Sequence, residues 1–244
     1  MKPVRLDKLL ANLGYGSRRE VASLVEAGLV RLDGGEVARA DDKVTPTPDL
    51  PTRLKVRGSP VDPPPGLILM LHKPLGVTCS HKEDGALVYD LLPERWRRRD
   101  PPISTVGRLD KETSGLLLMT DDGTLLHRII SPKAKIAKRY RVELDRPLGG
   151  DEAAIFASGH LKLEGEDKPL LPATLDELGP KEAWLTIEEG RYHQVRRMFA
   201  AVGNHVAALH RDRIGGLELP SDLPPGRYRL LATFELDAVF GTLR

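Results

Sequence analysis

The chain has 244 residues, of which 30% are charged and 40% hydrophobic, and its formal net charge is +2. This length allows one large domain or two smaller ones, and no apolar run approaches the roughly 20 residues that span a bilayer. Residues 1–7 contain no apolar stretch of a secretory signal, and a single cysteine, Cys79, excludes an internal disulfide. No Cys/His cluster has metal-ligand spacing. We therefore expect a soluble, cytoplasmic chain without a metal or a membrane partner.

The positions of the charged residues along the chain are more informative about possible partners than the net charge. Three local basic clusters stand out, at residues 95–99, 133–139 and 191–197. Clusters of this kind suit a phosphate backbone, although solvated basic faces are equally common. The charge pattern alone leaves both interpretations open.

The first fifty residues have the pattern of a small module. Leucines at helical spacing predict a helix over residues 5–13, and the glycines at 14 and 16 end it. Ser17 and Glu20 form a capping-box signature that opens a second helix, which ends at Gly28. Strands are expected over 29–32 and 37–44. Four cations would project from the helix pair: Arg5, Lys8, Arg18 and Arg19.

The rest of the chain predicts a linker and a larger domain. Seven prolines between residues 45 and 66 predict a semi-rigid linker over 51–65, with at most one short strand at 54–56. This divides the chain into domains at 1–50 and 66–244. In the second domain, strands are expected at 67–71, 116–120, 140–144, 184–187 and 206–209, and helices at 124–130, 151–158 and 193–202. Because they do not alternate strictly, the fold class expected is α+β, with a mixed, mainly antiparallel sheet flanked by helices.

One short stretch is the first candidate for chemistry. Gly107, Arg108, Leu109 and Asp110 place an acid between a turn glycine and an apolar strand. A carboxylate beside an arginine at the mouth of a sheet is held ionised, so Asp110 is a candidate nucleophile or base. A surface ion pair between Arg108 and Asp110 is the commoner alternative.

Four motifs in a fixed order extend this interpretation. They are Leu-His-Lys-Pro-Leu-Gly-Val at 71–77, the Gly-Arg-Leu-Asp stretch with its continuation to 123, Lys-Arg-Tyr at 138–140, and Glu-Gly-Arg-Tyr-His-Gln-Val-Arg-Arg-Met at 189–198 with its continuation to 204. Together they resemble the RsuA-type pseudouridine synthases, and residues 1–50 are similar to an S4 RNA-binding domain. The resemblance covers nearly the whole chain. It implies a catalytic domain that isomerises uridine to pseudouridine in structured ribosomal RNA, with an aspartate and no cofactor.

The resemblance also implies three catalytic residues. Asp110 matches the family's aspartate, which attacks the sugar or the base or abstracts a sugar proton. Arg196 matches the basic position after His-Gln-Val and would pair with Asp110, lowering the pKa of that carboxyl; the alternative is a phosphate contact. Tyr140 matches the family's tyrosine, which stacks on the uracil and relays the C5 proton. Its alternative is an ordinary core tyrosine.

Further residues are expected to bind the RNA. Val195 falls where the family places an aliphatic side chain against the base, and Arg108 would fill the gap that the extruded uridine leaves. Arg18 and Arg19 would contact phosphates. The reaction requires no histidine, so five histidines are interpreted as structural or RNA-facing: His72, His127, His193, His205 and His210.

The prediction of the substrate rests on weaker sequence features than the prediction of the reaction. The stretch 199–216 and the absence of a long tail after Arg244 favour small-subunit ribosomal RNA. A sibling activity on large-subunit ribosomal RNA is the first alternative. A non-catalytic S4-domain assembly factor and an aspartate-dependent hydrolase are weaker ones, because the first would not retain Asp110, Tyr140 and Arg196 and the second leaves the S4-like module unexplained. We expect a monomer whose partner is ribosomal RNA or a pre-ribosomal ribonucleoprotein.

Overall fold

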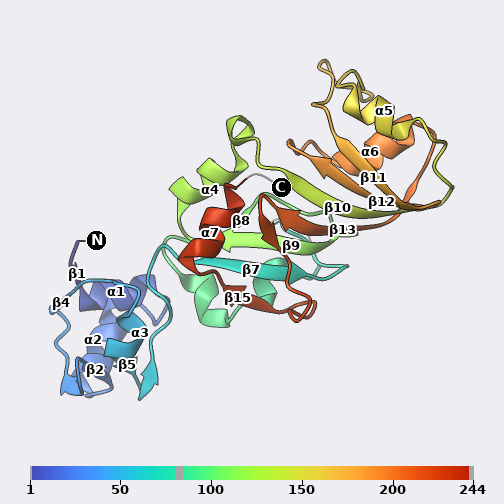
Figure 1. Ribbon diagram of the computed structural model, residues 1–244. Helices are drawn as coiled ribbons and strands as arrows, with labels where there is room; N and C mark the ends of the chain where they lie inside the picture. Colours follow the sequence, from blue (N-terminus) through green and yellow to red (C-terminus); the bar gives the residue numbers. More distant parts are fainter. Residues whose placement is uncertain (1, 81–84, 242–244) are drawn as a thin grey trace. The chain divides into compact units, whose positions relative to one another are not determined.

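The computed structural model describes residues 2–80 and 85–241 (Figure 1). The chain forms two compact units. The first comprises Met1–Ile68, Tyr89–Ser104 and Met119–Gly123, and the second comprises Leu69–Val88, Thr105–Leu118 and Thr124–Arg244. Among the helices of the described residues, none is long and apolar enough to cross a membrane.

The first unit opens with the predicted pair of helices, α1 (Leu6–Asn12) and α2 (Arg18–Glu26). The capping box is confirmed: the amide of Glu20 donates to Ser17 Oγ at 3.3 Å, and the amide of Ser17 donates to Glu20 Oε2 at 2.7 Å. Gly14, between the helices, has a φ of +89°, and a Cβ there would lie 2.3 Å from the carbonyl oxygen of Arg95. Only glycine therefore fits this turn.

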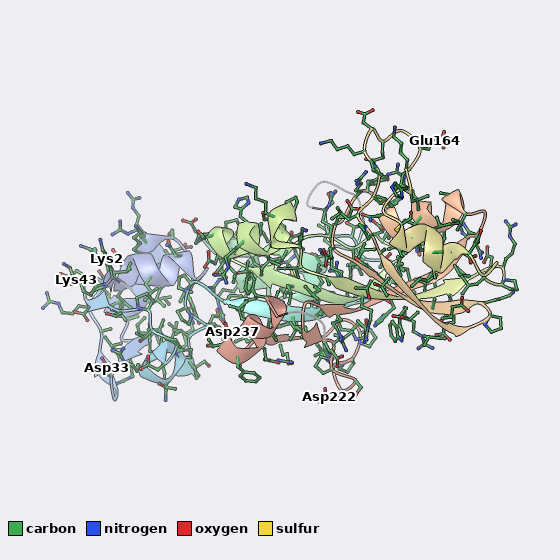
Figure 2. The ribbon with its side chains drawn as sticks, turned by 45° about the horizontal axis from the view of Figure 1, so that its top comes forward. Lys2, Asp33, Lys43, Glu164, Asp222 and Asp237 are labelled. Atoms are coloured by element: carbon green, nitrogen blue, oxygen red, sulfur yellow. The ribbon has the colours of Figure 1, made fainter. Side chains whose placement is uncertain are left out.

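Two small sheets complete the module. β1 (Val4–Arg5) pairs with β4 (Lys43–Val44), and a four-stranded sheet has the order β3 (Glu36–Val37), β2 (Val30–Leu32), β5 (Leu54–Val56), β6 (Ser59–Pro60). In the β1–β4 pair Lys43 lies opposite Arg5, and Figure 2 labels Lys43 together with Asp33, which lies at the turn after β2.

The linker expected over 51–65 is corrected by the structure. The short strand expected at 54–56 is confirmed as β5, which pairs with β2, but the segment also contains α3 (Leu50–Arg53) and β6. Leu54 and Val56 alternate into the hydrophobic core of this unit, where they are 0% and 5% exposed. The prolines are compatible with this structure because Pro51 lies in the first turn of α3 and Pro60 on an edge strand.

The same unit includes a segment distant in sequence, with the 3₁₀ helices η1 (Val88–Leu91) and η2 (Glu94–Arg98). Arg95 donates to Asp62 at 2.5 Å, and the amide of Asp100 donates to the carbonyl of Asn12 at 2.8 Å. Arg99 forms an ion pair of 2.8 Å with Asp121, and both side chains are 1% exposed. These contacts fix the segment to the helix pair and to residues near 62.

The second unit is built on a large sheet. Its order is β11 (Thr174–Gly179), β12 (Glu182–Ile187), β10 (Lys138–Leu144), β13 (Val206–Ile214), β9 (Ser114–Thr120), β7 (Ile68–Lys73) and β15 (Tyr228–Leu230), with β14 (Leu217–Glu218) on β13 and β8 (Ser104–Val106) on β9. β9 and β13 run parallel, whereas β10 runs antiparallel to both β12 and β13. The α+β class with a mixed, mainly antiparallel sheet is confirmed.

Helices cover this sheet. α5 (Glu152–Ala157) packs on β11 and α6 (Gln194–Ala201) on β13, and Figure 1 shows both over the β10–β12–β11 end. α4 (Gly123–Ile130) precedes the 3₁₀ turn η3 (Pro132–Ala134), and α7 (Thr233–Val239) packs on β14. Phe156 and Phe199 join α5 to α6 by an edge-to-face contact of 5.2 Å between ring centroids.

Candidate active site

Asp110 lies in the loop between β8 and β9, at the wall of a cavity of about 900 Å³ in the second unit. Gly107 turns the chain into this loop with a φ of +74°, and the amide of Thr113 donates to the Asp110 carbonyl at 3.0 Å. Leu109 is buried, and its amide donates to Cys79 Sγ at 3.5 Å. The buried leucine anchors the loop, and the carboxylate, 36% exposed, remains accessible from the cavity.

Two cations hold the backbone that follows Asp110. Lys73 is fully buried, and its Nζ donates to the carbonyls of Thr113 at 2.8 Å and Lys111 at 3.4 Å. Arg196 donates to the carbonyl of Glu112 at 2.8 Å and to that of Val206 at 2.9 Å. The carbonyls of three consecutive residues are thus each bonded by a cation, which fixes the direction of the Asp110 loop. Burial lowers the pKa of Lys73, and attraction to Cys79 and Asp110 opposes that effect.

The expected ion pair between Arg196 and Asp110 is corrected. Within the described residues no ion pair joins them, because the guanidinium of Arg196 is committed to the two backbone carbonyls. The imidazole of His193 lies beside the carboxylate instead, with Nε2 3.5 Å from Asp110 Oδ1. His193, which the sequence interpretation set aside, is therefore in contact with the candidate catalytic group, and Arg196 braces the loop that carries it.

Tyr140 projects from β10 into the same cavity and is 8% exposed. It pairs across the sheet with Arg211, at an irregularity in the β10–β13 register. Arg211 Nη1 donates to the Tyr140 hydroxyl at 3.4 Å, and Nε donates to the Leu116 carbonyl at 2.9 Å. Arg211 is 2% exposed, and within the described residues it has no ion-pair partner and its Nη2 has no acceptor. Tyr140 is therefore in contact with a buried guanidinium that has no carboxylate partner within the described residues.

The strand that carries Arg211 depends on one glycine. Gly115 on β9 lies opposite Arg211 with a φ of +114°, and a Cβ there would lie 2.1 Å from the Arg211 carbonyl oxygen. Any larger residue would push the two strands apart. The Gly115 of the sequence motif therefore allows β9 and β13 to approach each other where the cavity is built.

Apolar side chains form the remaining walls of the cavity. Val195 is 5% exposed at the start of α6, and it lines the cavity with three other buried side chains: Ile187, Leu209 and Ile214. Lys138 also lines it, and burial, with repulsion from Arg211, lowers the pKa of this lysine to about 8. The result is a cavity with apolar walls, several cations and three carboxylates, those of Asp110, Glu188 and Glu189. Such a lining suits a planar, polar-edged ligand.

Many of the cations in the sequence clusters are paired with acids. Arg95, Arg97, Arg98 and Arg99 each contact a carboxylate. Arg191 and Arg197 both contact Glu166, in the loop that follows α5 and that Figure 2 marks at Glu164. Arg108 and Lys111 differ: both are exposed at the cavity, and neither side chain has a hydrogen bond or an ion pair within the described residues.

The two arginines expected to bind RNA in the first unit have different surroundings. Arg18 contacts Asp7 at 2.7 Å, and Arg5 contacts the same carboxylate at 3.1 Å. Hydrogen bonds from these arginines, that of Arg5 foremost, lower the pKa of Asp7 to about 2. The side chain of Arg19 is exposed and has no contact of this kind within the described residues.

The comparisons with known proteins agree with this architecture. The family model described as "RNA pseudouridylate synthase" matches residues 67–201, and that of the S4 domain matches residues 4–47. With this fold, and with the loop motif of Asp110 at the cavity, the chain belongs to the RNA pseudouridylate synthase family. It is accordingly an enzyme of that class with an S4 RNA-binding domain.

The chain is also similar over nearly its whole length to individual proteins of this family. The chain is 43% identical over 238 residues to "Ribosomal small subunit pseudouridine synthase A" of Yersinia pestis, covering 97% of this chain and 98% of that protein. It is 42% identical over 240 residues to the protein of the same name from Escherichia coli K12, covering 97% and 100%. A solved structure described as "Crystal structure of pseudouridylate synthase" superposes with a TM-score of 0.67 at 35% identity, covering 97% of this chain and 99% of that one.

Proposed function

We propose that this chain converts a uridine of small-subunit ribosomal RNA into pseudouridine, with Asp110 as the reacting carboxylate. The observation that carries the proposal is the position of Asp110, on a doubly braced loop at the wall of a cavity of about 900 Å³. Similarity over 97% of the chain to relatives named for small-subunit ribosomal RNA supports the substrate.

The proposed reaction is balanced without a co-reactant. The bond between C1′ and N1 breaks, a bond between C1′ and C5 forms, and the proton on C5 is replaced by one on N1. No electrons are gained or lost, so a cofactor is not required by stoichiometry. Asp110 acts by attacking the sugar or the base or by removing a sugar proton, and His193 Nε2 lies 3.5 Å from its carboxylate.

Tyr140 and Val195 hold the uracil from opposite sides, and the Tyr140 hydroxyl relays the C5 proton late in the reaction. Arg211 donates to that hydroxyl oxygen at 3.4 Å. Because one lone pair of the oxygen is then occupied, the hydroxyl hydrogen points away from Arg211. Arg211 is therefore assigned as the residue that positions Tyr140.

The remaining roles concern the RNA. Arg108, exposed at the cavity, occupies the space that the extruded uridine leaves and offsets part of the cost of unstacking. Arg18 and Arg19 contact phosphates from the S4-like domain, which the sequence bounds at 1–50 and which β5 and β6 extend to Pro60. The enzyme acts as a monomer in the cytoplasm, on ribosomal RNA or its assembling ribonucleoprotein.

The test is to map pseudouridine by carbodiimide-stop sequencing in ribosomal RNA from cells with the gene, without it, and with it encoding Asp110→Asn. The expected result is one small-subunit site that is lost in the second and third strains. A missing site in large-subunit RNA would instead identify the sibling activity, and an unchanged map would refute the proposal.

A further inference from the structure

Tyr192 and His193 form an aromatic stack at the cavity. Their ring centroids are 3.9 Å apart and the rings are inclined by 17°. Tyr192 is 71% exposed, so one face of its ring covers His193 and the other is open to solvent. Both residues line the cavity that contains Asp110. The open face of the Tyr192 ring is therefore accessible to a ligand that enters this cavity.

Hydrogen bonds hold the backbone turn that carries the Tyr192–His193 stack. His193 has the left-handed φ of +49°, and its Nε2 lies 3.5 Å from Asp110 Oδ1. The carbonyl of Tyr192 accepts from Arg197 at 3.2 Å, and the amide of Arg191 donates to Gln194 Oε1 at 2.9 Å. A ring on a turn held in this way loses little conformational entropy when a second ring stacks on it.

The charges around the stack indicate the ligand. Arg108 and Lys111 are exposed at the same cavity, and neither side chain has a hydrogen-bond or ion-pair partner within the described residues. A flat ring over Tyr192 with anions beside it is the chemistry of a nucleotide in an RNA strand. The target uracil itself is assigned to the space between Tyr140 and Val195, so the ring over Tyr192 belongs to a different nucleotide.

We propose that the open face of Tyr192 binds the base of a nucleotide that flanks the target uridine. The inference rests on the proposed function, and it adds a second base-binding position to the site. Stacking of this kind contributes to binding whatever the identity of the base, and removing the aromatic ring weakens binding by about 5- to 150-fold.

The first experiment compares Tyr192→Ala, Tyr192→Leu and Tyr192→Phe with a matched control, Phe234→Ala. Phe234 is 75% exposed on α7 and lies outside the cavity lining. Activity is measured by tritium release from ribosomal RNA labelled at uridine C5. The expected result is a KM raised about 5- to 150-fold by Ala and by Leu, with kcat within a few-fold of wild type, while Phe and the control leave KM unchanged.

The second experiment uses RNA in which each nucleotide flanking the mapped target is in turn made abasic. At one position, the loss caused by the abasic nucleotide and the loss caused by Tyr192→Ala are expected to be non-additive, because both remove the same stack. Additive losses at every flanking position, or a normal KM for Tyr192→Leu, would overturn the inference while leaving the enzyme's function intact. A wild-type protein that releases no tritium would overturn the proposed function as well.

Discussion

Replacing Arg211 should separate activity from stability. Its guanidinium is 2% exposed, and within the described residues Nη2 has no acceptor and no carboxylate neutralises the charge. Arg211→Met leaves the Leu116 carbonyl without its donor, at a cost of about 1–3 kcal/mol. It also removes the desolvation penalty of the buried cation, which is several kcal/mol. We expect the free energy of unfolding, measured in urea, to stay within about 2 kcal/mol of wild type or to rise.

Activity should fall nonetheless. A hydrogen bond from a charged donor contributes about 1.5–3 kcal/mol, and the contact with Tyr140 is long, at 3.4 Å, so the lower end applies. This corresponds to a decrease in kcat of about tenfold. In the Tyr140→Phe background the acceptor is gone, and Arg211→Met should then lower any residual kcat by less than about threefold.

Two outcomes would refute this reasoning. If Arg211→Met slowed the Tyr140→Phe enzyme by the same tenfold factor, Arg211 would not act through the hydroxyl. If the free energy of unfolding fell by about 3–5 kcal/mol, as when one partner of a buried ion pair is removed, Arg211 would be a structural residue.

Asp110→Asn should abolish pseudouridine formation and leave RNA affinity within a few-fold, since phosphate contacts set affinity; measurable tritium release by this variant would remove Asp110 from the mechanism. Arg196→Lys should be nearly as inactive as Arg196→Ala in the same assay, because lysine has one nitrogen in place of the separate Nη1 and Nη2 atoms that bond the two carbonyls; activity close to wild type in the lysine variant would contradict that account. Arg19→Glu should flatten the log–log salt dependence of RNA binding by at least about 0.7–0.9, with Lys2→Glu as a control, and an unchanged slope would show that Arg19 makes no phosphate contact. Lys138 has a folded-state pKa of about 8, below that of the unfolded chain, so the unfolded chain binds more protons between about pH 8 and 10.5. The stability of wild type relative to Lys138→Met should therefore rise across that window in urea titrations, and a flat difference would show that the lysine is not desolvated.

The local sequence pattern correctly predicted those helices and strands whose residues interact mainly with near neighbours in the chain. The helix pair and its cap at Ser17 follow from residues within four positions of one another, and β9 follows from its apolar run. In the proline-rich segment the strand at 54–56 was expected and is β5, but α3 and β6 were missed because the proline density of 51–65 predicted a linker. The pairing of β5 with β2 could not be predicted locally, because the two strands lie more than twenty residues apart. β11 and α7, with few apolar residues at regular spacing, gave no signal that favoured either element.

For the candidate site too, the sequence identified some residues and missed others. Motif resemblance identified Asp110, Tyr140 and Val195, and the structure brings all three to one cavity. It could not show that Arg196 bonds backbone carbonyls, because carbonyls carry no sequence signal and one of them lies 84 residues away. Lys73 and Arg211 were missed for a related reason. Lys73 ends an apolar strand and Arg211 lies among charged neighbours on β13, and only burial distinguishes either cation from one that faces solvent.

The division of the chain into units has a practical consequence for anyone who wishes to trim it. The backbone passes from one unit to the other at five places, after residues 68, 88, 104, 118 and 123. One proteolytic cleavage near residue 60 therefore cannot release the S4-like region as a complete unit. A deletion of residues 1–60 would likewise leave part of that unit behind on the rest of the chain. Such a cut would uncover the surface that η2 shares with the turn at Gly14 and leave Arg95 facing the space where that turn had been. Transplanting this RNA-binding module onto another enzyme would require residues 89–104 and 119–123 to be transferred with it.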